Sequence, residues 1–124
     1  MLKKIETEKA PAAIGPYSQA VVHGDVVFTS GQIPINPETG AVEAVGITDQ
    51  TEQVMKNLGE ILYAAGSSYE KAIKTTCFLA EISDFAAFNE VYAKYFTDKP
   101  ARSCVAVKDL PKGVLVEVEV IAEI

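Results

Sequence analysis

The chain has 124 residues, of which 48% are hydrophobic and 23% are charged, and this composition is typical of one ordinary folded domain that spans residues 1–124. Its 17 acidic residues outnumber its 11 basic residues and give a net charge of −6, which argues against a nucleic-acid partner. No apolar run approaches the roughly 18 residues of a membrane span, and the charged N-terminus lacks a signal-peptide core, so we expect a cytoplasmic protein with no membrane partner.

Short strand patterns dominate the first part of the chain. Residues 2–6 fit an edge strand, and residues 19–22 and 26–30 fit a hairpin whose turn is the sequence HGD. Between them, residues 9–16 contain two prolines, which cannot donate to a strand ladder and therefore predict a loop. Residues 31–46 hold three glycines and two prolines, so a long surface loop is expected there.

A helical period follows this loop. Apolar residues recur at steps of three and four over residues 47–65, which predicts an amphipathic helix of about 17 residues. Thr48 or Asp49 is expected to cap its start, and Gly66 suits the left-handed residue that follows a helix. The sequence SSYE at residues 67–70 resembles a capping box on a single turn.

The rest of the chain is predicted to form three strands and a second helix. The strands are expected at residues 73–80, 102–107 and 114–124. The second helix lies between the first two of them, where Ser83 is expected to cap its start and Pro100 prevents its continuation. Its apolar stripe comprises Phe85, Phe88, Val91 or Tyr92, Tyr95 and Phe96.

This order, β-β-β-α-β-α-β-β, predicts an α+β fold in which two helices pack on one face of a mixed sheet. The last strand supplies an apolar face for the helices, formed by Val114, Val116, Val118 and Val120. Its other face is mixed, since it carries Leu115, Glu117, Glu119 and Ile121. A solvated sheet face seldom places Leu and Ile beside Glu, so we expect another subunit to cover it.

Few residues in the chain suit common catalytic or metal-binding chemistry. The single histidine, His23, falls in the hairpin turn and is expected to be solvated. Cys77 and Cys104 have neither a CxxC spacing nor partner histidines, so we expect two reduced thiols and no zinc. Nucleotide-binding, zinc-protease and serine-hydrolase motifs are also missing. We therefore expect neither a metal nor another cofactor.

Arg102 and Glu117 are the pair of residues that the sequence pattern makes most interesting. If Val105 and Val107 face the helices, strand alternation sends Arg102 and Cys104 to the other side of the sheet. If Val116 and Val118 do so as well, Glu117 joins them there. A guanidinium in a partly dry cleft binds a carboxylate through two parallel hydrogen bonds, and a nearby glutamate can hold or deprotonate a water. The alternative is an interface salt bridge between the two, and the pattern does not choose between them.

Further polar residues next to strands have two readings each. Gly31, after Ser30, either permits close approach of a ligand or forms a plain turn. Tyr17 either closes a pocket or packs as a loop anchor, and Asn89 either reaches a ligand or binds loop backbone.

Taken together, several segments resemble the RidA family, also called YjgF, over nearly the whole chain. They are APAAIGPYSQA (10–20), FTSGQIP (28–34), the helix ending AAG (64–66), KTTCFLAEISDFAAFNEVY (74–92) and PARSCVAVKDLPKGVLVEVEVIA (100–122). The last segment is the most specific of these signatures.

The resemblance implies a chorismate-mutase-like fold and a homotrimer with clefts between subunits. Family members of this type hydrolyse enamine and imine intermediates, such as 2-aminoacrylate and 2-iminobutyrate, to 2-keto acids and ammonia without a cofactor. The resemblance assigns substrate-carboxylate binding to Arg102 and the attacking water to Glu117. It also places Tyr17, Ser30, Gly31, Asn89 and Cys104 in the substrate pocket. Non-catalytic sensing of 2-keto acids is the alternative, and an RNA-acting role is disfavoured by the net charge.

Overall fold

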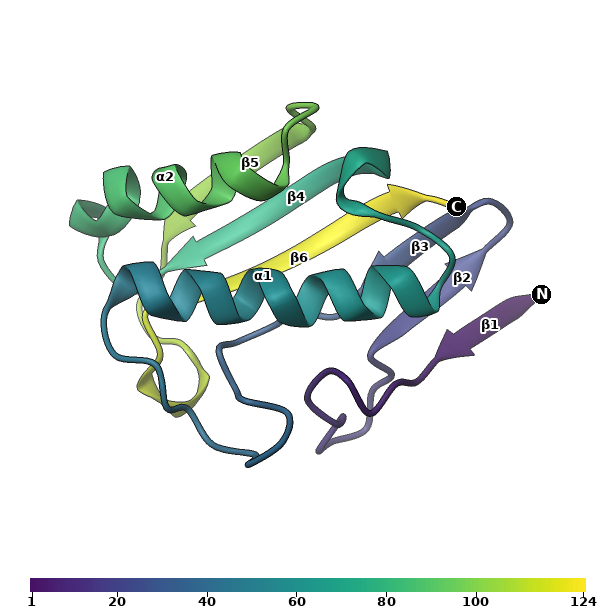
Figure 1. The fold of residues 1–124 in the computed structure, drawn as a ribbon, viewed down its shortest axis with the longest axis horizontal. Coiled ribbons are helices and arrows are strands. Elements are labelled where there is room, and N and C mark those ends of the chain that lie inside the picture. Colours follow the sequence, from purple (N-terminus) through teal and green to yellow (C-terminus); the bar gives the residue numbers. More distant parts are fainter.

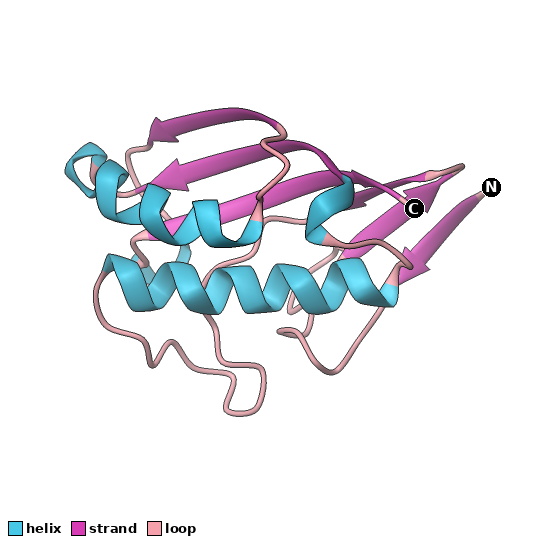
Figure 2. Cartoon of the chain, turned by 45° about the horizontal axis from the view of Figure 1, so that its top comes forward, coloured by secondary structure: helices cyan, strands magenta, loops and turns pink.

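The computed structural model describes residues 1–124 as a six-stranded sheet with two helices on one face (Figures 1 and 2). Its strands and helices are β1 (Leu2–Ile5), β2 (Ala20–His23), β3 (Val26–Thr29), α1 (Ile47–Ala64), β4 (Ala72–Leu79), α2 (Phe85–Tyr95), β5 (Ala101–Ala106) and β6 (Val116–Glu123). The strand order is β1-β2-β3-β6-β4-β5; only β4 and β5 are parallel. The expected α+β fold with its mixed sheet is confirmed. Neither helix is long and apolar enough to cross a membrane.

The core lies between the helices and the sheet. On β6 every second residue is buried, and these residues are Val116, Val118, Val120 and Ala122. They pack against fully buried side chains of the two helices, among them Leu58, Ile61 and Phe88. Removal of such side chains from water is the main stabilising contribution, about 1.5–3 kcal/mol for each large one. The predicted helix-facing side of the last strand is therefore confirmed.

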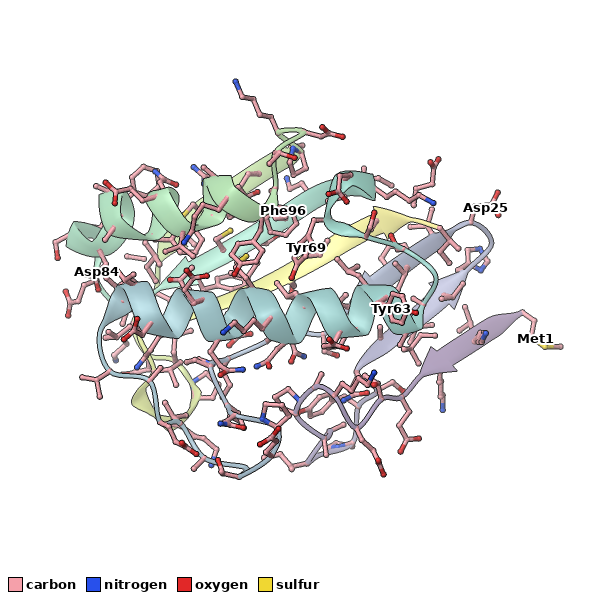
Figure 3. All side chains as sticks on the ribbon, in the orientation of Figure 1. Met1, Asp25, Tyr63, Tyr69, Asp84 and Phe96 are labelled. Carbon is pink, nitrogen blue, oxygen red and sulfur yellow. The ribbon has the colours of Figure 1, made fainter.

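An aromatic contact joins the residue after α2 to the turn after α1. The rings of Tyr69 and Phe96 meet edge to face, with centroids 5.6 Å apart, and lie next to each other in Figure 3. The Tyr69 hydroxyl donates to the backbone carbonyl of Met55 at 2.6 Å. Tyr69 can lie against α1 because Gly59 has no side chain, where any Cβ would collide with the phenol. This packing holds the end of α2 next to α1.

The helix ends differ from the sequence-based expectations at two of three points. Gly46, with φ of 83°, is the N-cap residue of α1, and no side chain caps this end of the helix. Neither Thr48 nor Asp49 is therefore the cap. Ser83 lies within a short 3₁₀ turn, and α2 begins only at Phe85 without a side-chain cap. The end of α1 is as expected, because Gly66 has φ of 85° and the backbone closes by hydrogen bonds back to the last turn.

The expected capping box at residues 67–70 is also wrong. The 3₁₀ turn there begins at Tyr69, after Ser68, and has no side-chain cap. The Ser67 hydroxyl instead donates to the backbone carbonyl of Glu123 at 2.6 Å. It therefore ties the end of α1 to the end of β6, a tertiary contact that local sequence does not reveal.

The predicted face of Arg102 and Cys104 is wrong as well. Parallel pairing places Arg102 opposite Thr75 and Cys104 opposite Cys77, and both β4 partners are buried on the helix side. Val105 points to the opposite, open face of the sheet and is 46% exposed. The prediction took apolar residues of β5 as markers of the core. That reasoning fails on an edge strand, because the open face of this sheet is itself partly apolar.

This open face carries apolar and acidic side chains side by side. Phe28, 44% exposed, pairs with Ile121, and Phe78 pairs with Glu117. Val105 extends the apolar part to the edge strand. Both helices lie on the other face, so neither of them covers the open face (Figure 2).

Candidate functional site

A cavity of about 510 Å³ lies where the first loop, the end of β3 and the start of β6 meet. Its walls include four of the residues singled out from the sequence, here called the cavity group: Tyr17, Ser30, Gly31 and Glu117. Its apolar walls come from Pro11, Ile14, Ile33 and Ile35. The volume is in the range of small-molecule sites.

The carboxylate of Glu117 is the acidic group of this cavity. Burial raises the pKa of the Glu117 carboxyl above its usual value, and the neighbouring Glu119 carboxylate raises this pKa further. Glu117 forms no ion pair. A carboxyl whose pKa lies above its usual value is better suited to accept and return a proton near neutral pH than an ordinary surface glutamate.

Gly31 lies directly against this carboxylate. Gln32 forms a two-bond bridge with Val118, at 2.8 and 3.1 Å, which holds the chain beside β6. A Cβ on Gly31 would collide with the Glu117 side chain, whose carboxyl carbon would lie only 2.9 Å away. Gly31 therefore allows a close approach, as one reading of the sequence proposed, but the group that approaches it is Glu117.

Ser30 and Tyr17 complete the cavity group. The Ser30 hydroxyl donates to the backbone carbonyl of Ser18 at 2.6 Å, and the Ser30 amide donates to the carbonyl of Gln19 at 2.9 Å. These bonds hold the first loop against β3. The Tyr17 side chain is 50% exposed at the cavity wall, so its phenol is accessible to a ligand.

Two buried amides that the sequence analysis did not identify shape the cavity walls. Gln19, 3% exposed, accepts from the Thr7 amide at 2.7 Å and donates to the Pro11 carbonyl at 2.8 Å. Asn57, 1% exposed, donates to the carbonyls of Ile33 at 3.2 Å and Ile35 at 2.9 Å. The available signal was a polar residue on the apolar stripe of the first predicted helix, where Asn57 lies three residues after Val54 and four before Ile61.

Arg102, Cys104 and Asn89 form a second cluster, here called the edge group, between β5 and α2. Arg102 Nη1 donates to Asn89 Oδ1 at 2.7 Å. The guanidinium carbon lies 4.8 Å from the centroid of the Tyr92 ring and 5.5 Å from that of Phe85. Arg102 is the only arginine of the chain, and it forms no ion pair with any carboxylate.

The two thiols lie side by side across β4 and β5. Burial raises the pKa of Cys77 to about 12. Burial also raises the pKa of Cys104, although the Arg102 guanidinium partly opposes this. Both side chains are therefore neutral thiols at pH 7, and both are unbridged. His23 is exposed at the far end of β2 and belongs to neither group.

The cavity group and the edge group do not meet within one chain. Glu117 on β6 pairs with Phe78 and faces the open side, whereas Arg102 on β5 pairs with Thr75 and faces the helices. Strand β4 also separates β5 from β6. A salt bridge between Arg102 and Glu117 within the chain is therefore ruled out, and each group alone offers only part of a site.

Comparison with known proteins gives full-length matches. The sequence model of the family described as endoribonuclease L-PSP matches residues 7–124. A protein named as a regulator, AldR, from Lactococcus lactis is 52% identical over 99% of this chain and 98% of its own length. Reactive Intermediate Deaminase A of Arabidopsis thaliana is 51% identical over 95% of this chain and 64% of its own length. The 2-iminobutanoate/2-iminopropanoate deaminase of Rattus norvegicus is 48% identical over 97% and 88%.

Solved structures agree with these matches over the whole fold. Escherichia coli TdcF with bound serine is 47% identical, with a TM-score of 0.94 over 98% of both chains. The YjgF gene product of E. coli is 46% identical, with a TM-score of 0.93 over 98% of both chains.

Proposed function

Because the chain belongs to the endoribonuclease L-PSP family, which includes relatives named as deaminases, we propose that it hydrolyses 2-imino acids to 2-keto acids and ammonia. Its substrates would include 2-aminoacrylate, after protonation at its CH₂ carbon to the imine, and 2-iminobutyrate. The full-length matches bear out the resemblance to the RidA family that the motifs indicated.

The observation that carries this proposal is the unpaired guanidinium of Arg102. Asn89 occupies one of its five N–H donors, and no carboxylate of the chain pairs with it. A half-buried guanidinium with free donors binds a substrate carboxylate through two parallel bonds. All 2-imino acids and 2-keto acids carry such a carboxylate next to the reacting carbon. The bound serine of the E. coli relative TdcF is an amino acid with the same carboxylate.

The second part of the proposal is a homotrimer in which the edge group of one subunit faces the cavity group of the next. Within one chain these groups lie on opposite sides of the sheet, so a site that uses both Arg102 and Glu117 needs a second chain. The uncovered apolar face around Phe28 and Val105 and the unpaired edge of β5 supply surfaces for such contact.

The chemistry needs only orientation and one proton shuttle. A water held by Glu117 attacks the carbon of the protonated imine while the carboxylate accepts a proton from that water, and a carbinolamine forms. Glu117 returns this proton to nitrogen, and the C–N bond breaks with its electron pair on the leaving ammonia. The hydroxyl proton passes to Glu117 and then to ammonia as the C=O bond forms. The net reaction is iminium plus water to 2-keto acid plus ammonium.

A coupled assay tests this proposal. A threonine dehydratase generates 2-iminobutyrate, semicarbazide traps the free imine, and semicarbazone formation is followed with and without the protein. We expect the wild-type chain to suppress the trapped fraction and Arg102→Ala to lose this effect. Arg102→Lys keeps the charge but loses the two-bond fork, so it should retain only part of the activity. Lys56→Ala removes an exposed charge from α1 and serves as the matched control. Full activity of Arg102→Ala would refute the assignment.

A regulatory role is the second candidate, because the relative AldR is named as a regulator. The same carboxylate site would then bind a 2-keto acid without turnover. Tight binding of 2-oxobutanoate combined with an unchanged rate of imine decay would favour this role over hydrolysis. RNA cleavage, which the family description names, is disfavoured by the net charge of −6.

A further inference from the structure

Three side chains of α2 surround the guanidinium of Arg102. Phe85, Asn89 and Tyr92 follow each other at steps of four and three residues, so they share one face of the helix. This face lies against β5, where Asn89 accepts a hydrogen bond from Arg102 and both rings lie under its guanidinium carbon. The helix therefore offers Arg102 one acceptor and two aromatic surfaces.

The Tyr92 ring is itself held firmly. Its hydroxyl shares a buried hydrogen bond of 2.7 Å with Thr75 Oγ1, and Thr75 is the β4 partner of Arg102 in the sheet. Its ring packs against Phe96, with centroids 4.8 Å apart, and only 8% of the residue is exposed. Phe85 contacts the guanidinium from the helix start and is 36% exposed. Tyr92 is therefore a buried, fixed contact for the guanidinium, and Phe85 is a more exposed one.

The two rings restrict the guanidinium without using its donors. A ring face attracts the cation through its π electrons and leaves the N–H groups at the guanidinium edge free. Asn89 accepts a hydrogen bond from one of these N–H groups and thereby restricts rotation of the guanidinium within its own plane. We propose that Tyr92 and Phe85 are positioning residues that hold Arg102 with its remaining donors directed outward for a substrate carboxylate. This inference rests on the proposed deaminase function.

Kinetics of ring-conserving and ring-removing variants provide the first test. Tyr92→Leu should raise KM for 2-iminobutyrate, and Kd for 2-oxobutanoate, about ten-fold, which corresponds to loss of one desolvated cation–π contact. Tyr92→Phe keeps the ring and should stay within about two-fold of wild type. Tyr95→Leu is the matched control on the same helix, because Tyr95 binds Glu52 of α1 and does not touch Arg102. Phe85→Leu, at a more exposed position, tests the same idea if Tyr92→Leu does not fold.

NMR provides a second test that does not depend on turnover. Because Arg102 is the only arginine, ¹⁵N-arginine labelling gives one Nε–H signal, which reports the mobility of this guanidinium alone. We expect an ordered Nε–H in the wild type, Tyr92→Phe and Tyr95→Leu, and a mobile one in Tyr92→Leu and Phe85→Leu. An Nε–H equally ordered in folded Tyr92→Leu and Phe85→Leu would overturn the inference. If the wild type shows no turnover but this ring dependence holds, the deaminase proposal fails and the positioning role stands.

Discussion

Gly31→Ala is the sharpest prediction from the cavity, because it separates folding from activity. The added methyl group would collide with the Glu117 carboxylate, which is the far end of a flexible side chain and can rotate away. Gly31 does not have a left-handed φ, so alanine fits its backbone. Alanine also lowers the conformational entropy of the unfolded chain, which raises the free energy of unfolding by about 0.4–1 kcal/mol. Forcing Glu117 from its rotamer costs about 0.5–1.5 kcal/mol. The free energy of unfolding should therefore change by about 1 kcal/mol or less.

The activity should fall much further. Glu117 must move by at least about 1 Å to avoid the new methyl group, and a displacement of that size at a reacting group reduces turnover about 100-fold. Semicarbazone trapping measures turnover, and urea denaturation measures stability. Shortening the carboxylate in the double variant Gly31→Ala/Glu117→Asp relieves the collision and should restore part of the activity.

Gly24→Ala is the opposite control. Gly24 has φ of 60° in the hairpin turn and no neighbour within 4 Å of an added Cβ, so alanine there is strained but contacts nothing. It should lower the free energy of unfolding by about 1 kcal/mol and leave turnover unchanged. Full turnover of Gly31→Ala would refute the reasoning that Glu117 needs its place against Gly31 to act.

Three further predictions concern stability and assembly. Burial raises the pKa of Glu117, so the folded state binds its proton more tightly than the unfolded state, and this residue destabilises the fold increasingly as pH rises above about 4.5. Glu117→Gln should therefore have a higher Tm than wild type at pH 7, and thermal melts should show the difference disappearing near pH 4. Asn57→Leu removes two hydrogen bonds to cavity-wall carbonyls and should lower the free energy of unfolding by about 2–4 kcal/mol in urea titrations, whereas Asn57→Gln should lose less. Val105→Glu places a charge on the open sheet face and should convert a trimer into monomers, as measured by light scattering. Val45→Glu, at an 85% exposed loop position, should leave the trimer intact. A trimeric Val105→Glu protein would contradict the proposed interface.

Periodicity predicted the first helix and the last strand with its buried face, but not the face of every strand. Steps of three and four over residues 47–65 gave α1, and alternation over residues 114–124 gave β6 with its helix-facing side. These patterns are reliable because the buried face recurs at every helical turn or at every second residue of a strand. Many residues therefore indicate the same element and the same buried face. The helix caps were predicted less well. A cap depends on one side chain, and Gly46 and Ser67 show that backbone geometry or a distant strand can take its place.

The resemblance in the sequence motifs also named seven candidate site residues, but only the tertiary structure decided how they are grouped. Alternation fixed that Arg102 and Cys104 share a face, yet it placed that face on the wrong side, because β5 lies at the sheet edge and has apolar residues on both sides. Which side faces the helices depends on pairing with β4, a contact between segments about 27 residues apart that no local pattern encodes. The division into a cavity group and an edge group follows from this register. It also explains why Glu117 does not pair with Arg102 within one chain, since Glu117 points to the opposite face of the sheet.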